Sequence, residues 1–334
     1  MQARFTKRTF QFKKPSGTSR GILTEKHAWF IELWEEEFPE VIGMGECSII
    51  PGLSPDFIDF NSYEAMLSKV CFNIDQDLSR WPSIKFGVEC AKLDLKHGGR
   101  GLIFKNAFSR GERSIPINGL IWMGHRTFML DQIHEKIEQG FTTLKMKIGA
   151  IDFNSEVDLL RLIRAQSESL IIRVDANGAF SPTEAAAKLQ ALSNIGIHSI
   201  EQPIKQGQWK EMAALCKSTP LPIALDEELI GVNAMEDKVM LLNTINPQYI
   251  ILKPSLHGGI SGTKEWISLA EERSIKWWIT SALESNVGLN AICQLAAEYD
   301  NPLPQGLGTG SLYTDNIPSN LSVKKGNISL INVD

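Results

Sequence analysis

Three acidic residues recur at almost equal intervals along the middle of the chain, and each ends a short run of β-branched or apolar residues. They are Asp175, Glu201 and Asp226, separated by 26 and 25 residues. Lysines continue the spacing, because Lys147 lies 28 residues before the first acid and Lys253 lies 27 residues after the last. Each interval accommodates one strand, one helix and two short connections, the crossover that neighbouring parallel strands need. The repeat therefore predicts a barrel of alternating strands and helices.

We expect eight parallel strands, the number that closes such a barrel. The predicted strands cover residues 115–121, 143–148, 170–175, 197–201, 222–226, 248–253, 276–281 and 303–307. Helices are predicted between them, for example over 153–167 and 182–192, and Ser181 before Pro182 is typical of a helix start. Because the carboxyl ends of barrel strands meet at one mouth, the three acids are predicted to converge there.

The first part of the chain follows a different pattern. Short strands are predicted at 22–24 and 28–31, a turn-rich stretch at 43–55, and helices at 63–74 and 84–96. Strands followed by helices favour a separate α+β domain. We therefore predict an α+β capping domain over residues 1–110, a barrel that carries the site over 111–309, and a final segment, 310–334, that packs back on the first domain.

Composition narrows the range of partners. The net charge is −5 and no basic cluster stands out, so we expect no nucleic-acid partner. The chain has neither the apolar run of a signal peptide nor the roughly 18 apolar residues of a membrane span. Its five cysteines are widely spaced without a C-x-x-C pair, which favours free thiols. These features predict a cytoplasmic enzyme of small molecules, and they leave its oligomeric state open.

The three acids together indicate a metal site. Carboxylate oxygens are the ligands that Mg²⁺ prefers, and Mn²⁺ is an alternative. Zinc is less favoured because His198 and His257 fall outside the strand-end pattern. A single strand-end acid is more often a helix cap or the partner of a surface lysine, but three consecutive units that each place one favour a metal.

The flanking lysines indicate proton transfer. Side chains alternate along a strand, so Lys145 and Lys147 are predicted to point inward while Met146 points outward, with Lys253 across the mouth. Crowding ammonium groups beside a divalent ion is expected to lower their pKa toward the range of a general base. A structural ion pair is the alternative for any one of them. Abstraction of a proton α to a carboxylate leads either to racemisation or, with a β-leaving group, to elimination.

Five segments carry a resemblance to a known family. They are Leu144–Lys147, Val174–Asn177, Ile200–Pro203, Leu225–Glu227 and Leu252–Pro254. Together they resemble the muconate-lactonising branch of the enolase superfamily, whose members use a lysine or histidine base with one or two Mg²⁺ ions. The resemblance implies a modified TIM barrel, (β/α)₇β, with an α+β capping domain, and a carboxylate substrate.

Within that branch, the segments Ser281–Gly288 and Gly306–Gly310 resemble o-succinylbenzoate synthases. The resemblance implies the syn-dehydration of 2-succinyl-6-hydroxy-2,4-cyclohexadiene-1-carboxylate in menaquinone biosynthesis. It makes Lys147 the base and then the acid, and Lys253 a cation that steadies the enediolate. It places Asn177 and Glu227 behind the ligands, where such groups orient them.

Four further residues are candidates for substrate contact. The resemblance implies Ser281 and Ser285, while the glycines Gly258 and Gly259 allow backbone amides to approach a carboxylate. A plain turn at the start of a helix is the alternative for the glycines. In the capping domain, residues 45–55 are a candidate lid over the mouth.

Three alternatives to the dehydration stay open. Dipeptide epimerases usually carry Asp-x-Asp on the eighth strand, where this chain reads Gly306-Leu307-Gly308-Thr309. An N-acylamino acid racemase using the same lysines and metal is therefore the stronger competitor. A catalytically silent barrel is the weakest alternative, because every lysine and acid of the pattern is present.

Overall fold

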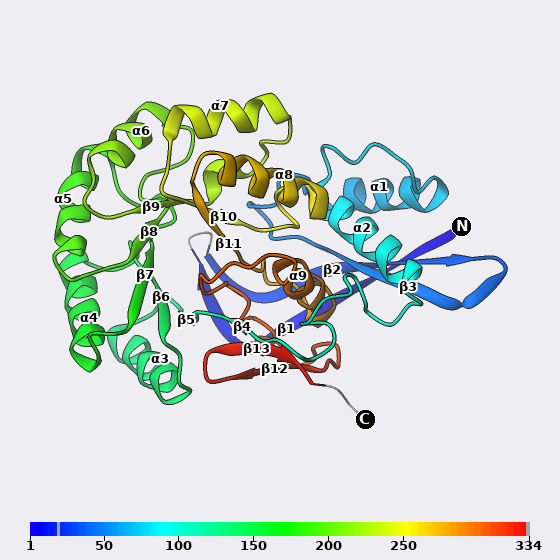
Figure 1. Ribbon diagram of the computed structural model, residues 1–334, viewed down its shortest axis with the longest axis horizontal. Helices are drawn as coiled ribbons and strands as arrows, with labels where there is room; N and C mark the ends of the chain where they lie inside the picture. The colour runs from blue at the N-terminus through cyan, green and yellow to red at the C-terminus, as the bar shows by residue number, and fades with distance from the viewer. Residues whose placement is uncertain (19–20, 332–334) are drawn as a thin grey trace.

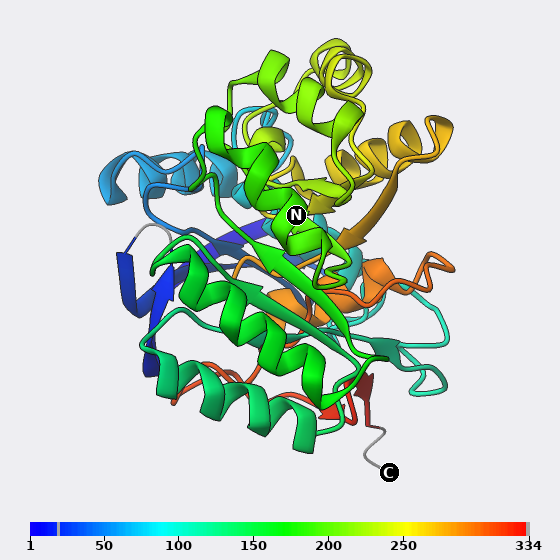
Figure 2. The ribbon, with the colours of Figure 1, turned by 90° about the vertical axis from the view of Figure 1, so that its left-hand side faces the viewer.

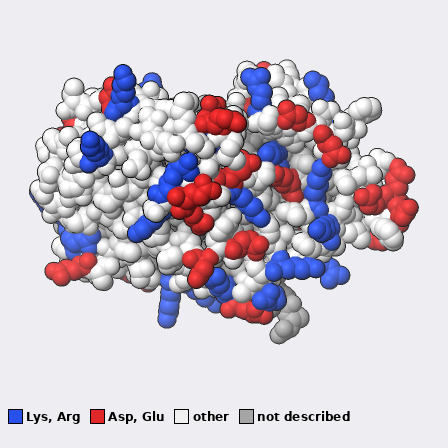
Figure 3. Space-filling view, turned by 45° about the horizontal axis from the view of Figure 1, so that its top comes forward, with Lys and Arg blue, Asp and Glu red and all other residues white. Residues whose placement is uncertain are grey.

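A three-stranded antiparallel sheet forms the capping domain. The computed structural model describes residues 1–18 and 21–331. The sheet runs in the order β1 (Gln2–Thr18), β2 (Gly21–Glu35), β3 (Phe38–Ser48), and it packs against α1 (Phe60–Phe72) and α2 (Pro82–Lys96) (Figure 1). Acidic side chains gather at the tip of the β2–β3 hairpin, where Glu35, Glu36 and Glu37 are exposed (Figure 3).

The turn predicted in residues 43–48 is wrong, because this segment belongs to β3. Its glycines serve close packing instead. A Cβ on Gly45 would stand 1.8 Å from the carbonyl oxygen of Gly87 on α2, and one on Gly43 would stand 2.2 Å from that of Ala91. Glycine is therefore required where backbone meets backbone. The short strands predicted at 22–24 and 28–31 are likewise one continuous strand, β2.

The second domain is a sheet of parallel strands wrapped by helices, confirming the predicted modified barrel (Figure 2). Its strands are β5 (Gly119–Ile121), β6 (Thr143–Lys147), β7 (Ile171–Asp175), β8 (Ser199–Glu201), β9 (Ile223–Leu225), β10 (Tyr249–Leu252) and β11 (Lys276–Ile279), paired in that order. The helices are α3 (Arg126–Glu138), α4 (Phe153–Gln166), α5 (Pro182–Ser193), α6 (Trp209–Ser218), α7 (Met235–Ile245), α8 (Gly259–Glu272) and α9 (Asn286–Ala296).

The eighth strand predicted at 303–307 is reduced to two isolated bridges. Gln305 pairs with Ile117 and Gly306 pairs with Thr280, both in the parallel sense. These bridges join the β5 side of the sheet to the β11 side and close the ring. Pro302 and Pro304 lie beside them, and proline has no N–H with which to extend a ladder.

The first predicted strand, 115–121, is also interrupted. It divides into β4 (Ile115–Pro116) and β5, and β4 pairs with a C-terminal hairpin of β12 (Leu321–Lys324) and β13 (Asn327–Leu330). The C-terminal segment therefore divides its contacts. Tyr313 packs on Phe10 and Phe12 of β1, whereas the hairpin lies against β4 instead of the capping domain. Residues 332–334 of the predicted segment lie outside the described residues.

Two separate hydrophobic cores hold the two domains. One lies between the barrel strands and their helices, and the other lies between the capping sheet and its helices. A third cluster joins them, because Phe10 and Phe30 of the capping sheet pack with Ala282 and Tyr313. Among the described residues, no helix combines the length and apolar character needed to cross a membrane.

Candidate active site

The carboxyl ends of five consecutive barrel strands carry the predicted acids and lysines. Lys147, Asp175 and Glu201 are the last residues of β6, β7 and β8, while Asp226 and Lys253 directly follow β9 and β10. The strands are parallel and in register, so these ends lie at the same edge of the sheet. The structure thus brings together the residues that were predicted from spacing alone.

Ion pairs connect these side chains directly. The Lys145 Nζ atom lies 3.0 Å from Asp175 Oδ2 and 2.5 Å from Glu201 Oε2. The Lys147 Nζ atom donates to the same Asp175 oxygen at 3.0 Å. On the opposite side, Lys253 Nζ pairs with Asp226 Oδ2. Lys145 and Lys147 therefore approach the acids from one side and Lys253 from the other.

Burial and the neighbouring charges shift the pKa values of the acids in different directions. Burial raises the pKa of Glu201 well above its usual range, and the neighbouring Asp175 carboxylate adds to the rise. Burial also acts to raise the pKa of Asp175, but the ammonium groups of Lys145 and Lys147 outweigh it and lower that pKa. Glu201 is therefore the carboxylate whose charge the surrounding lysines compensate least.

The buried carboxylates raise the pKa values of Lys145 and Lys253. Burial acts to lower the pKa of Lys145, but the carboxylates of Asp175 and Glu201 raise it overall. The pKa of Lys253 is raised in the same way, chiefly by Asp226 against the effect of burial. The lowering expected beside a bound divalent ion stays a prediction, and in the arrangement described each of these two ammonium groups lies against a buried acid.

Unpaired carboxylate oxygens indicate how the site fits a divalent cation. Glu201 Oε1, Asp226 Oδ1 and Glu227 Oε2 are buried without a hydrogen-bond partner. Buried acceptors are rarely left unpaired in native proteins, and an all-oxygen donor set suits Mg²⁺ or Mn²⁺. Within the described residues, no three acidic, His or Cys side chains are grouped closely enough to enclose a cation as they stand, because ammonium groups occupy the space between them.

Asn177 and Glu227 contact the acid and lysine cluster, but they line the cavity beside Asp175 and Glu201 instead of lying behind them as predicted. The Asn177 side-chain oxygen accepts from Lys147 Nζ at 2.8 Å, and its Nδ2 donates to Glu227 Oε1 at 2.9 Å. Asn177 has a φ of 44°, a left-handed conformation that asparagine tolerates better than most residues. The amide therefore fixes the base candidate relative to Glu227.

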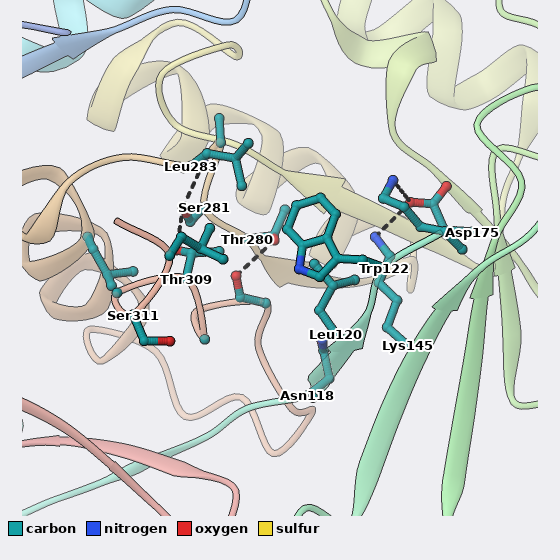
Figure 4. A pocket seen from close by; sticks show the side chains of 18 of the residues that line it. Asn118, Leu120, Trp122, Lys145, Asp175, Thr280, Ser281, Leu283, Thr309 and Ser311 are labelled. Carbon is teal, nitrogen blue, oxygen red and sulfur yellow. Dashed lines mark hydrogen bonds and ion pairs between the residues drawn. The ribbon is translucent and has the colours of Figure 1, made fainter. Parts of the chain in front are cut away.

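A cavity of about 860 Å³ opens from this charged edge toward the capping domain. Figure 4 shows Lys145 and Asp175 on one side, Ser281, Leu283 and Thr309 on the other, and Leu120 and Trp122 between them. Ile50 and Leu53 of the capping domain line it as well. The cavity thus combines a charged end with a wall of mixed apolar and hydroxyl side chains, as expected for a site that takes a small molecule with an anionic head.

A family model described as enolase C-terminal domain-like matches residues 129–332. This chain belongs to the enolase superfamily. The o-succinylbenzoate synthase of Desulfotalea psychrophila is 48% identical to it, over 98% of both sequences, and the crystal structure of MenC from that organism matches 99% of both chains with a TM-score of 0.85 and 44% identity. The family and fold predicted from the sequence are therefore confirmed.

Two further proteins in the comparison are less similar to this chain. The o-succinylbenzoate synthase of Thermosynechococcus elongatus BP-1, crystallised with Mg in its active site, shares the fold with a TM-score of 0.75 at 22% identity over 92% of each chain. The L-Ala-D/L-Glu epimerase of Bacillus subtilis is 29% identical over 49% of this chain and 45% of its own sequence.

Of the four residues predicted to contact substrate, Ser285, Gly258 and Gly259 lie outside the cavity lining. Ser281 lines the cavity, but its hydroxyl donates to Glu284 Oε2 at 2.8 Å and points into the wall. Ser285 is buried and donates to Glu46. Gly258 and Gly259 lie outside the cavity lining, because the first turn of α8 is occupied by a carboxylate of the capping domain, Glu89. The glycines are therefore part of a helix-start turn.

Several residues that shape this site were missed. Gln202 is fully buried, and its side-chain oxygen accepts from the backbone N–H groups of Asp226 and Glu228, each at 3.2 Å. It therefore holds the turn that presents Asp226. Its position directly after Glu201 was the available signal. The wall residue Trp122 gave no periodic signal, because it lies in the loop after β5, whereas Ile50 falls within the segment 45–55 that was predicted over the mouth.

Proposed function

We propose that this chain catalyses the dehydration of 2-succinyl-6-hydroxy-2,4-cyclohexadiene-1-carboxylate to o-succinylbenzoate. The observation that carries the proposal is the pair of lysines, Lys147 and Lys253, on opposite sides of three buried carboxylates at the end of an 860 Å³ cavity. The high identity to a synthase over nearly the whole chain supports the same reaction. The reaction places this protein in menaquinone biosynthesis.

Lys147 is the residue placed to move the proton. In its neutral form its Nζ removes the proton from C1 of the substrate, and the electron pair passes into the carboxylate as an enediolate. The resulting ammonium group then returns that proton to the hydroxyl at C6, which leaves as water while the ring becomes aromatic. The Asn177 side-chain oxygen accepts from the Lys147 Nζ atom at 2.8 Å and so positions it.

Lys253 and Lys145 serve electrostatic roles. The Lys253 ammonium group, on the other face, stabilises the negative charge that develops on the substrate. Lys145 lies between Asp175 and Glu201 and balances their charge. Asp175, Glu201 and Asp226 are proposed to hold one Mg²⁺, or Mn²⁺, which when bound supplies Lewis-acid stabilisation to the substrate carboxylate.

An N-acylamino acid racemase is the second candidate, because lysines on both faces are what a two-base racemisation requires. Lys253 would then return a proton to the face opposite Lys147. A dipeptide epimerase is disfavoured, since the segment Gly306–Thr309 carries no acid to hold a substrate ammonium group. The partner in each case is a small-molecule carboxylate. We also propose a cytoplasmic location, which the five free cysteines support.

Two assays on the same preparation separate these candidates. The first follows Mg²⁺-dependent turnover of the cyclohexadiene carboxylate, and the second follows ²H exchange at the α-carbon of N-succinyl amino acids. Rapid dehydration with slow exchange is the expected result. Rapid exchange with poor dehydration would make the protein a racemase, and inactivity in both assays would reject both functions.

A further inference from the structure

Two glutamates of the capping domain contact the starts of the last two barrel helices. Glu46 on β3 accepts from the backbone N–H groups of Ser285 and Gly288, at 2.8 and 2.9 Å, and from the Ser285 hydroxyl at 2.6 Å. Glu89 on α2 accepts from Ile260 N at 2.5 Å and from the Ser261 hydroxyl at 2.6 Å. Figure 1 shows the two contacts, α9 beside β3 and α8 beside α2.

Both contacts are closely fitted. Glu46 is fully buried, so its carboxylate depends on these three donors for the hydrogen bonds that water would otherwise supply. A Cβ on Gly259 would stand 2.4 Å from Glu89 Oε2, and one on Gly288 would stand 3.0 Å from Glu46 Oε2. The N-terminal amides of a helix favour a negative charge. Each helix is therefore fixed at its first turn by the other domain.

The Glu89 contact leads to Lys253 through one short turn. The backbone oxygen of Lys253 accepts from Leu256 N at 2.8 Å and from His257 N at 3.0 Å. The backbone N–H of Lys253 donates to His257 Nδ1 at 2.9 Å, and Gly259 N donates to the oxygen of Pro254 at 2.9 Å. A shift of the start of α8 is therefore transmitted to the backbone of this lysine.

The Glu46 contact leads to the cavity wall. Ser285 directly follows Glu284, a fully buried carboxylate that accepts from the Ser281 hydroxyl at 2.8 Å and from Ala282 N at 2.7 Å. The Thr309 hydroxyl in turn donates to Ser281 at 2.9 Å. Lys26 of the capping domain adds a bond to the Ala282 oxygen at 2.9 Å. The wall opposite the charged edge is therefore fixed from the capping domain.

We infer that Glu89 and Glu46 are positioning residues of the reaction, Glu89 for Lys253 and Glu46 for the wall formed by Ser281 and Thr309. The inference rests on the proposed function, because it assigns Glu89 to the chemical step of that reaction and Glu46 to the binding of its substrate. Lys253 acts on the charge that develops during the reaction, so Glu89 affects kcat. The wall contacts the substrate before and during the reaction, so Glu46 affects KM.

The test compares three isosteric variants of the full chain, Glu89→Gln, Glu46→Gln and Glu64→Gln. Glu64 is the matched control, because it belongs to the capping domain and its side chain contacts Trp29 and Lys7 of the same domain. With saturating Mg²⁺ and the cyclohexadiene carboxylate, Glu89→Gln is expected to lower kcat about tenfold with little change in KM, and Glu46→Gln to raise KM about tenfold with little change in kcat. Glu64→Gln is expected to match the wild type.

Amide hydrogen exchange is measured on the same variants in the absence of substrate. It tests the inference even if the wild type does not dehydrate the cyclohexadiene carboxylate and the proposed function is rejected. Glu89→Gln is expected to speed exchange in residues 253–261, and Glu46→Gln in residues 281–288. Kinetics and exchange like those of Glu64→Gln would overturn the inference. A uniform rise in exchange along the chain, with equal losses of activity in both variants, would also overturn the inference, because that result indicates a general loss of stability.

Discussion

Glu201 ends strand β8 and His198 directly precedes it, and burial is the main cause of the pKa shift of each, upward for Glu201 and downward for His198. Burial raises the pKa of Glu201, whose Oε1 atom has no partner. Burial lowers the pKa of His198 to about 4, and its ring nitrogens contact the hydroxyls of Ser199 and Tyr249. The carboxyl end therefore holds a buried carboxylate that pairs with Lys145 through one oxygen and leaves the other unpaired, whereas the amino end holds a neutral, paired ring.

This difference shows how the barrel divides function from stability. Sites in such barrels lie at the carboxyl ends of the strands, while the amino ends contribute mainly to stability. Between the two ends of this barrel, Arg173 is buried, stacks 4.0 Å above the Trp278 ring, and donates to the Pro304 oxygen. Substitutions at the carboxyl end should therefore change turnover, and substitutions at the amino end should change stability.

Lys147→Ala is expected to affect the carboxyl end most. Removing the base should lower turnover of the cyclohexadiene carboxylate by about 10²- to 10⁴-fold, the usual contribution of a positioned acid or base, without unfolding the chain. Steady-state kinetics and circular dichroism measure both. Lys188→Ala is the control, because Lys188 pairs with Glu184 on the surface of α5. If Lys147→Ala keeps most of the activity, the base has been assigned to the wrong residue.

Glu201→Gln is expected to separate activity from stability. Turnover with Mg²⁺ should fall by at least the roughly 10- to 100-fold that loss of an outer partner costs. The raised pKa means that the ionised carboxylate destabilises the folded state as pH rises above the unfolded value. The metal-free variant should therefore unfold at an equal or higher temperature at pH 7. A marked drop in melting temperature, absent from the surface control Glu211→Gln, would contradict this account.

The strand-end residues could be predicted because their positions follow from chain geometry. One βα unit has a nearly fixed length, so equal spacing of Asp175, Glu201 and Asp226 implies equal depth in the barrel. Alternation within a strand placed Lys145 and Lys147 on the same face. These inferences need no knowledge of how distant segments pack.

The cavity wall could not be predicted in the same way. Trp122 and Leu120 reach the site only through tertiary packing, and the segment 45–55 was predicted over the mouth without any signal that singled out Leu53. Gly259 was expected to approach a substrate carboxylate, but it approaches the carboxylate of Glu89. Gly259 does approach a carboxylate, as predicted. That carboxylate could not be identified from the sequence, because Glu89 lies on another element more than 150 residues away.

Asn177→Ala is expected to have an intermediate effect. It removes the bonds to Lys147 and Glu227, and loss of such an orienting group typically costs about 10- to 100-fold in activity or metal affinity. Asn246→Ala is a matched control. Asn246 also has a left-handed backbone, with a φ of 48°, but it ends α7. Both variants should lose similar stability, and equal losses of turnover would remove Asn177 from the site.

His198→Gln is expected to have the smallest effect, and only on stability. The pKa of His198 is about 4 in the folded chain and 6.5 when unfolded. Between these values the unfolded state binds more protons, so the free energy of unfolding falls as pH drops through this window. Because the ring is partly exposed, we expect a loss of about 1 to 2 kcal/mol.

Urea unfolding at pH 7 and pH 4.5 measures this term. The wild type should lose more stability than His198→Gln between the two values, while the two proteins should turn over substrate at equal rates at pH 7. An unchanged pH dependence would show that the histidine is not held neutral by the fold. A large loss of turnover would show that the amino end of β8 reaches the site, and the division between the two ends would then fail.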